Sequence, residues 1–157
     1  MTAVTLLIRH AHAGKRKDFA GNDALRPIDD RGRAEAETIG VAAALFAPHR
    51  LIAATPLRCR QTLEPLARTL GLPIVTDGAF AEPAEPEEIP ARVKAAAARL
   101  TELRDGVRTA VCSQGKVIPD LLALLDGAPD ATPYKTPKGD GWVLSWSGDR
   151  LAALSRL

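Results

Sequence analysis

The chain has 157 residues, of which 46% are hydrophobic and 25% are charged. This composition is typical of a globular protein, and the length suits one domain over residues 1–157. The formal net charge of +2 is too small to favour nucleic acid or an anionic membrane as a partner. Two cysteines are too few for a disulfide framework, and three histidines leave little for a metal site.

The sequence predicts neither a membrane span nor a secretion signal. Spanning a bilayer takes about 18 consecutive apolar residues, and no such stretch occurs. The first residues lead directly into a strand pattern, without the charged start and apolar centre of a signal peptide. We therefore expect a cytoplasmic, reducing setting and no membrane contact, while the oligomeric state is left open.

The expected elements alternate between strands and helices along the chain. Asp30 is the expected N-cap of the first helix, because its carboxylate can accept unpaired backbone N–H groups. Gly71 is expected to end the second helix in the left-handed conformation. The predicted strands cover residues 3–9, 51–55, 73–76, 108–113, 142–147 and 151–157, and the predicted helices cover residues 30–46, 56–70, 90–104 and 117–125.

This alternation indicates an α/β fold with a mainly parallel sheet and helices on both of its faces. The last two strands are expected to form a hairpin around residues 147–149, Ser-Gly-Asp. A fold class alone does not define a function, so the function has to be inferred from the residues at the strand ends.

Three of the predicted strands end in residues that suit an anion-binding site. The first ends in Arg9-His10, the second leads into Arg58 in the first helical turn, and the fourth ends in residues 113–116, Ser-Gln-Gly-Lys. In a parallel sheet these ends lie at one edge, where ligands bind. Gly115 would allow the backbone to approach a ligand, and two helix N-termini would add N–H donors. The pattern predicts a pocket for a phosphoryl group.

His10 is the candidate nucleophile of this pocket. Surrounding guanidinium groups disfavour the imidazolium form, so His10 should stay neutral and keep a free lone pair at neutral pH. The arginines would stabilise the charge that develops on a phosphoryl group in the transition state. Transfer to histidine and then to water divides one difficult step into two. We expect no metal and no cofactor, because the arginines take the electrostatic role.

Three segments carry a resemblance to a known family. Residues 6–11, Leu-Leu-Ile-Arg-His-Ala, resemble the Arg-His-Gly signature of the histidine phosphatase superfamily, with alanine in place of glycine. Residues 54–62 are similar to its second-strand motif, in which Arg58 matches a phosphate-binding arginine. Residues 25–28, Leu-Arg-Pro-Ile, resemble short phosphohistidine phosphatases of the SixA type, which makes Arg26 a further pocket arginine. The resemblance covers essentially the whole chain and implies a phosphoglycerate mutase-like, three-layer α/β/α sandwich.

One position departs from the family pattern. The family places a second histidine after the fourth strand, followed by glycine, and here Gln114 precedes Gly115. A glutamine amide donates to a phosphoryl oxygen but carries no charge and moves no proton. The loss of one charge-assisted donor costs on the order of 2–4 kcal/mol of transition-state stabilisation. Gln114 is therefore expected to bind the substrate, with an inactivating change as the alternative.

A narrower likeness concerns the second half of the chain. Residues 113–120, 136–139 and 142–145 resemble the phosphatase-like half of certain two-domain Nudix hydrolases that act on nucleoside polyphosphates. This chain contains no Nudix box. The likeness therefore implies a nucleotide phosphate as one candidate substrate.

Other polar residues have less certain roles. Glu82 follows the third strand, where many family members keep a general acid, although residues 85–88 offer three more glutamates as decoys. His12 is either a substitute for the missing histidine or a loop residue beside the site. Lys116 and Lys138 are candidates for holding a second phosphate or a partner's acidic face, or are simply solvated.

The sequence thus predicts a metal-independent phosphatase that forms a phosphohistidine on His10. By resemblance, its substrate is a protein phosphohistidine or a small phosphorylated molecule such as a nucleotide. The alternative is a catalytically impaired module that binds phosphate, a nucleotide or a partner, which Gln114 favours. A nucleotide-cofactor oxidoreductase is disfavoured because no Gly-x-Gly-x-x-Gly follows the first strand.

Overall fold

The sheet of the computed structural model, which describes residues 3–157, has the strand order β3-β2-β4-β1-β5-β6. Parallel pairing joins β1 to β4, β4 to β2 and β2 to β3, whereas β5 runs antiparallel to both β1 and β6. The sheet is therefore mainly parallel, as predicted, with an antiparallel hairpin at one edge. Its strands are β1 (Ala3–Arg9), β2 (Arg50–Ala53), β3 (Ile74–Thr76), β4 (Thr109–Ser113), β5 (Gly141–Ser147) and β6 (Arg150–Arg156).

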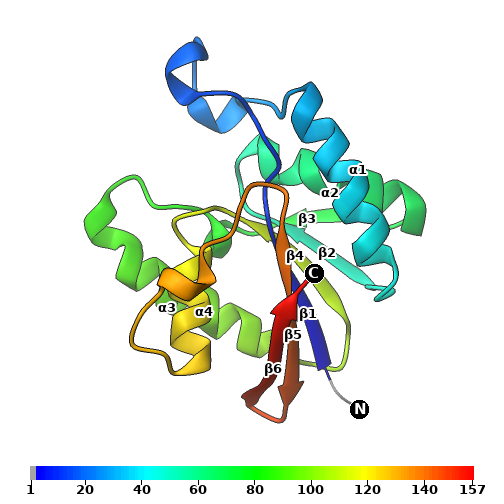
Figure 1. Ribbon diagram of the computed structural model, residues 1–157, viewed down its shortest axis with the longest axis vertical. Coiled ribbons are helices and arrows are strands. Elements are labelled where there is room, and N and C mark those ends of the chain that lie inside the picture. The colour runs from blue at the N-terminus through cyan, green and yellow to red at the C-terminus, as the bar shows by residue number, and fades with distance from the viewer. Residues whose placement is uncertain (1–2) are drawn as a thin grey trace.

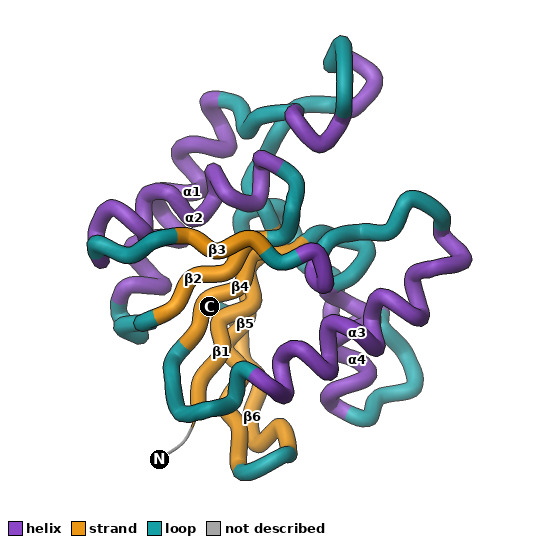
Figure 2. The backbone as a smooth tube through the Cα atoms, turned by 180° about the vertical axis from the view of Figure 1, so that it is seen from behind, coloured by secondary structure: helices purple, strands orange, loops and turns teal. Residues whose placement is uncertain are grey.

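Four helices cover the two faces of this sheet. Helices α1 (Asp30–Ala44) and α2 (Leu57–Leu70) lie together on one side, and α3 (Ile89–Glu102) and α4 (Ile118–Asp126) lie on the other (Figures 1 and 2). The three layers predicted from the alternation of elements are thus confirmed. Within the described residues, no helix is long and apolar enough to cross a bilayer.

The ends of two helices test the predicted caps. Gly71 ends α2 with φ +66°, in the left-handed conformation that was expected. The predicted N-cap of α1 is wrong by one residue, because Asp29 caps the helix and accepts a hydrogen bond from the Gly32 N–H at 2.8 Å. Asp30 is instead the first helical residue, with its side chain in solvent. Either aspartate suits the role by type, and the backbone of Asp29 has the extended conformation that a cap needs.

The apolar core lies along the central strands and holds their carboxyl ends in place. Leu6, Leu7 and Ile8 of β1 are at most 1% exposed, as expected for a strand covered on both faces. Helix residues such as Leu63 and Leu122 pack into the same continuous cluster. Full burial of one such side chain contributes roughly 1.5–3 kcal/mol. The core therefore places Arg9 and His10 at a rigid strand end.

Candidate active site

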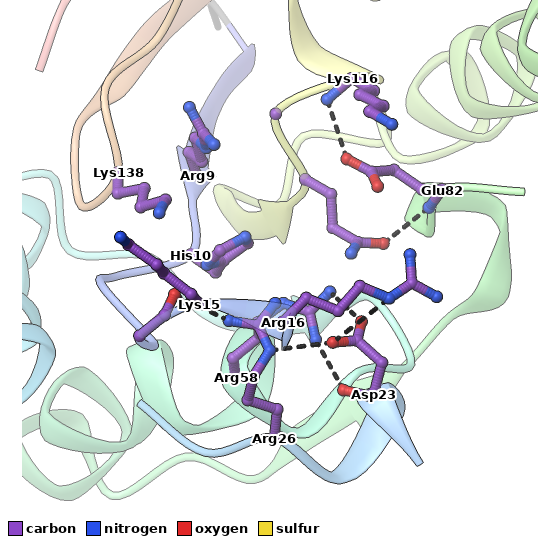
Figure 3. Close-up of a pocket in the computed structure, with 13 residues that line it drawn as sticks. Arg9, His10, Lys15, Arg16, Asp23, Arg26, Arg58, Glu82, Lys116 and Lys138 are labelled. Atoms are coloured by element: carbon purple, nitrogen blue, oxygen red, sulfur yellow. Dashed lines mark hydrogen bonds and ion pairs between the residues drawn. The ribbon is translucent and has the colours of Figure 1, made fainter. Parts of the chain in front are cut away.

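The carboxyl ends of β1, β2 and β4 meet at a pocket of about 480 Å³. Figure 3 shows its charged side chains gathered around His10. The structure brings together the seven residues that the sequence analysis assigned to catalysis or substrate binding: Arg9, His10, Arg26, Arg58, Glu82, Gln114 and Gly115. The lining also includes the two candidate lysines, Lys116 and Lys138, and four residues not singled out: Gly14, Lys15, Arg16 and Asp23.

His10 is held at the base of the pocket by its backbone and its ring. Its backbone N–H donates to the Ser113 carbonyl at 3.1 Å, which continues the pairing of β1 with β4. Its side chain is only 6% exposed, and Nδ1 lies 2.9 Å from the Ala11 carbonyl. Because a carbonyl oxygen only accepts, this contact requires a proton on Nδ1 and leaves the lone pair on Nε2. The ring is therefore held in the tautomer that a nucleophilic histidine needs.

Burial is the main reason why this imidazole is neutral. Desolvation lowers the pKa of His10 from 6.5 to about 4, against the opposing effect of the Ala11 carbonyl. The positive charges of Arg58, Arg9 and Lys138 act in the same direction as burial, and their smaller effects are included in this pKa of about 4. The expectation of a neutral His10 agrees with this direction, although the sequence argument named the guanidinium groups rather than burial as the cause.

Asp23 joins two of the arginines into one cluster. Its Oδ1 accepts from Arg26 Nε at 2.9 Å, and its Oδ2 accepts from Arg58 Nη2 at 3.2 Å. Arg58 Nη1 also donates to the Asp23 carbonyl at 3.0 Å. Burial opposes the charged form of Asp23, but the hydrogen bond from Arg26 and the charges of Arg58, Arg26 and Arg16 outweigh it and lower its pKa. Asp23 is thus ionised and orients both guanidinium groups.

The sequence analysis did not identify Asp23, Lys15 or Arg16 as pocket residues. A local signal existed only for the pairing of Asp23 with Arg26, and none existed for the contact of Asp23 with Arg58. Asp23 lies three residues before Arg26. No comparable signal marks Lys15 and Arg16, which are exposed loop residues.

Arg9 depends on the absence of a side chain at Gly115. Its Nη1 donates to the Thr136 carbonyl at 2.7 Å. A Cβ atom at Gly115 would lie 2.5 Å from Arg9 Cζ, which is too close for real atoms. The structure shows that Gly115 makes room for the Arg9 guanidinium, and since Gly115 also lines the pocket, the approach of its backbone to a ligand stays a prediction.

Gln114 and Glu82 form the opposite wall of the pocket. Gln114 is 3% exposed, and its Oε1 accepts from the Glu82 backbone N–H at 2.6 Å. This bond leaves the Gln114 amide NH2 as the donor available to a ligand. Glu82 Oε1 accepts from the Lys116 N–H at 3.0 Å, so its carboxylate is held at the rim. The glutamates of residues 85–88 are exposed and do not line the pocket.

His12 lies outside the pocket lining. Its Nδ1 is paired with Asp29 Oδ2 at 2.5 Å. The same Asp29 oxygen accepts from the Gly14 N–H, and the other oxygen caps α1. His12 therefore belongs to the helix cap and does not take the place of the missing histidine. His49, the third histidine, is exposed on the surface.

Comparison with known proteins establishes the family. Residues 5–84, about half of the chain, match the model of the histidine phosphatase superfamily (branch 1). The chain belongs to this superfamily, and its sheet and layers are the phosphoglycerate mutase-like fold. Within the described residues, no group of three or more His, Cys, Asp or Glu side chains is placed to hold a metal ion.

A curated relative is the 8-oxo-(d)GTP phosphatase of Mycolicibacterium smegmatis, which is 38% identical over 165 residues. The match takes in 99% of this chain but only 48% of that protein, so this chain spans about half the length of its relative. The extra length agrees with the expected likeness to one half of a two-domain protein. That the other half is a Nudix domain stays a prediction.

Solved structures of low sequence identity share the fold. The protein histidine phosphatase SixA, complexed with tungstate, superposes with a TM-score of 0.76 at 20% identity, over 98% of this chain and 94% of that one. The mycobacterial glucosyl-3-phosphoglycerate phosphatase gives a TM-score of 0.73 at 14% identity, over 98% and 96% of the two chains. The shared fold carries different substrates, so the substrate of this chain has to be inferred from its own pocket.

Proposed function

We propose that this chain is a phosphatase that transfers a phosphoryl group from a nucleotide to His10 and then to water. The observation that carries the proposal is the His10 ring, neutral and fixed through Nδ1, in a pocket lined by seven arginine and lysine side chains and two carboxylates. Membership of the histidine phosphatase superfamily supports this chemistry. The nucleotide is supported by the name of the Mycolicibacterium relative.

In the first step, His10 Nε2 attacks phosphorus while the bond from phosphorus to the leaving oxygen breaks. The leaving oxygen keeps the electron pair and takes the proton of Glu82 in its acid form, which leaves Glu82 as the carboxylate. The new positive charge on the ring is stabilised by the Nδ1–H bond to Ala11. A guanidinium has five N–H donors, and the bonds to Asp23 use two of those on Arg58. The remaining donors of Arg58 and Arg9, with the Gln114 amide, bind the phosphoryl oxygens.

In the second step, a water oxygen attacks phosphorus and the phosphorus–nitrogen bond breaks. The electron pair of that bond returns to His10 Nε2, so the ring is again neutral. The proton lost by the water passes to the Glu82 carboxylate, which is at the pocket rim. The guanidinium groups supply positive charge throughout, so the cycle closes with inorganic phosphate and the starting enzyme.

The second candidate function is a binding module without turnover. Gln114 favours it, because a neutral amide replaces the charged donor of the family pattern. Both candidates predict binding of a phosphorylated ligand at the same arginines. They differ only in whether a covalent bond forms at His10.

The test is to follow phosphate release and phosphoenzyme formation with 8-oxo-dGTP and with phosphoimidazole as donors. We expect the wild-type chain to release phosphate and to form an acid-labile phosphohistidine that His10→Ala abolishes. His49→Ala is the matched control, because His49 is on the surface. No turnover of either donor by the wild type, with phosphate binding unchanged in His10→Ala, would establish the binding module. Turnover of phosphoimidazole alone would indicate a protein phosphohistidine as the substrate.

A further inference from the structure

A second cleft adjoins the pocket around His10. It has a volume of about 400 Å³ and is formed by the loop between β1 and α1, with the first turn of α1. Gly14, Lys15 and Arg26 line both the cleft and the pocket, so the two spaces adjoin at these residues. In Figure 1 this loop projects beyond the end of the sheet. A ligand bound at His10 would have to extend along these three residues to reach the cleft.

Phe19 gives this cleft an aromatic surface. The chain has three Phe, two Trp and one Tyr, and the other five belong to the main apolar core or pack against it. Phe19 belongs to neither hydrophobic cluster of the described residues and is half-buried. Its backbone N–H donates to the Arg16 carbonyl at 3.2 Å, which holds it at the end of a short 3-10 turn. An aromatic ring that contributes nothing to the core is suited to stacking with a planar ligand.

The remaining lining makes the cleft less cationic than the pocket. Ala13, Pro27 and Ile28 supply apolar surface, and the one further cation, Arg33, is paired with Asp30 at 3.6 Å. Asp18 is an exposed carboxylate, whereas the Asp29 carboxylate is already occupied by its bonds to His12, Gly14 and Gly32. A site with cations at one end and an aromatic ring with a carboxylate at the other matches a nucleotide. Its phosphates are anionic, and its base combines a flat face with N–H donors.

We infer that the cleft binds the base of the substrate, stacked on the ring of Phe19, while the phosphates lie against the arginines and lysines. The inference rests on the proposed function, because it assumes that the phosphorylated ligand is a nucleotide. It makes Phe19 a specificity-determining residue. Lys15 and Arg26, which line both spaces, hold the phosphates at the junction.

The test compares two ligands that share a diphosphate and differ in the base, GDP and inorganic pyrophosphate. Their dissociation constants are measured by calorimetry on the His10→Ala chain, which cannot form the phosphoenzyme. We expect Phe19→Ala in that background to weaken GDP about tenfold, as for loss of one stacked base, and to change pyrophosphate less than twofold. Phe19→Trp should keep or strengthen GDP binding.

Leu25→Ala is the matched control, because Leu25 is 61% exposed on the same loop and lines neither space. It should leave both ligands unchanged. The inference is overturned when GDP binds no more tightly than pyrophosphate, or when Phe19→Ala weakens both ligands equally or neither. These outcomes are independent of turnover. If the wild-type chain forms no phosphohistidine but GDP binds more tightly than pyrophosphate and Phe19→Ala removes that difference, the proposed function is wrong and the inference about the base cleft is upheld.

Discussion

The two walls of the pocket are held by different kinds of bonds. On the ionic wall, Asp23 pairs with Arg26 and Arg58, and the side chain of Arg58 is only 6% exposed. On the amide wall, Gln114 and Glu82 are joined by a bond between a side-chain amide oxygen and a backbone N–H. The ionic wall is thus held by pairs of opposite full charges, whereas the bonds of the amide wall each have a neutral backbone N–H as the donor.

This difference suggests a division of labour around His10. The arginines of the ionic wall are oriented before a ligand arrives, so their charge acts on the phosphoryl group with little reorganisation. The amide wall adds no cation of its own in the interior, since Lys116 lies exposed at the rim. Its contribution is therefore to position the phosphoryl group and move protons. The predictions below test whether the two walls separate in this way.

The largest expected effect concerns pH, because burial and the arginines together lower the pKa of His10 to about 4. The unfolded chain, with an ordinary pKa of 6.5, takes up a proton that the folded chain excludes. The free energy of unfolding should therefore fall as the pH falls from 6.5 towards 4, by about 3 kcal/mol in total. Above pH 6.5 this contribution vanishes.

Urea unfolding of the wild type and of His10→Asn at several pH values between 4 and 7 measures the effect. The difference in the free energy of unfolding between the wild type and His10→Asn should change between pH 6.5 and pH 4. The free energy of unfolding of His49→Asn should follow that of the wild type. Acid-dependent loss of the carboxylate interactions affects all three proteins alike. Parallel curves for the wild type and His10→Asn would show that His10 is not buried in its neutral form.

Asp23→Asn tests the ionic wall. The amide keeps the size of the side chain but removes the charge that pairs with Arg26 and Arg58, so both guanidinium groups lose their orientation. We expect kcat/KM for a nucleotide to fall roughly 30-fold, which corresponds to about 2 kcal/mol. Asp149→Asn is the control, since that aspartate is exposed and lines neither the pocket nor the cleft. Equal effects of the two variants would contradict a positioning role for Asp23.

The strand ends of the site were predictable from the sequence for a simple physical reason. Apolar runs define buried strands, and parallel strands place their carboxyl ends at one edge, so Arg9, His10, Arg58 and Gln114 had to converge. The type of each residue then indicated phosphate chemistry. The convergence depended on no detail of the loops.

Loop contacts were not predictable, because they depend on how the chain folds back. Asp23 and Phe19 lie in a segment without periodicity, and nothing local shows that this segment closes over Arg58. Asp29 and Asp30 are equivalent by type, and only the backbone conformation separates the cap from its neighbour. The role of Gly115 required the position of a guanidinium from another strand.

Gly115→Ala tests the contact between the amide wall and Arg9. The added Cβ would displace the Arg9 guanidinium, which is the end of a flexible side chain, so the protein should still fold. We expect kcat/KM to fall about tenfold, because a displacement of about 1 Å in a catalytic group is costly. Gly40→Ala is the control, because its Cβ would meet neighbours only at 3.5 Å or beyond. A melting temperature lowered without loss of activity would contradict this role.

The smallest expected effect is a gain, in Gln114→His. A histidine can become a charged donor to the phosphoryl group, which the Gln114 amide cannot. We expect kcat/KM for p-nitrophenyl phosphate to rise about fivefold, less than the usual gain from a charge-assisted donor, because the bond from the Glu82 N–H is lost or weakened. Gln114→Glu, of the same size, removes the NH2 donor and adds a negative charge, so it should lower kcat/KM. An unchanged or lower value in Gln114→His would mean that the amide wall requires glutamine. The pocket would then be adapted to a substrate that is bound better by an uncharged donor at this position.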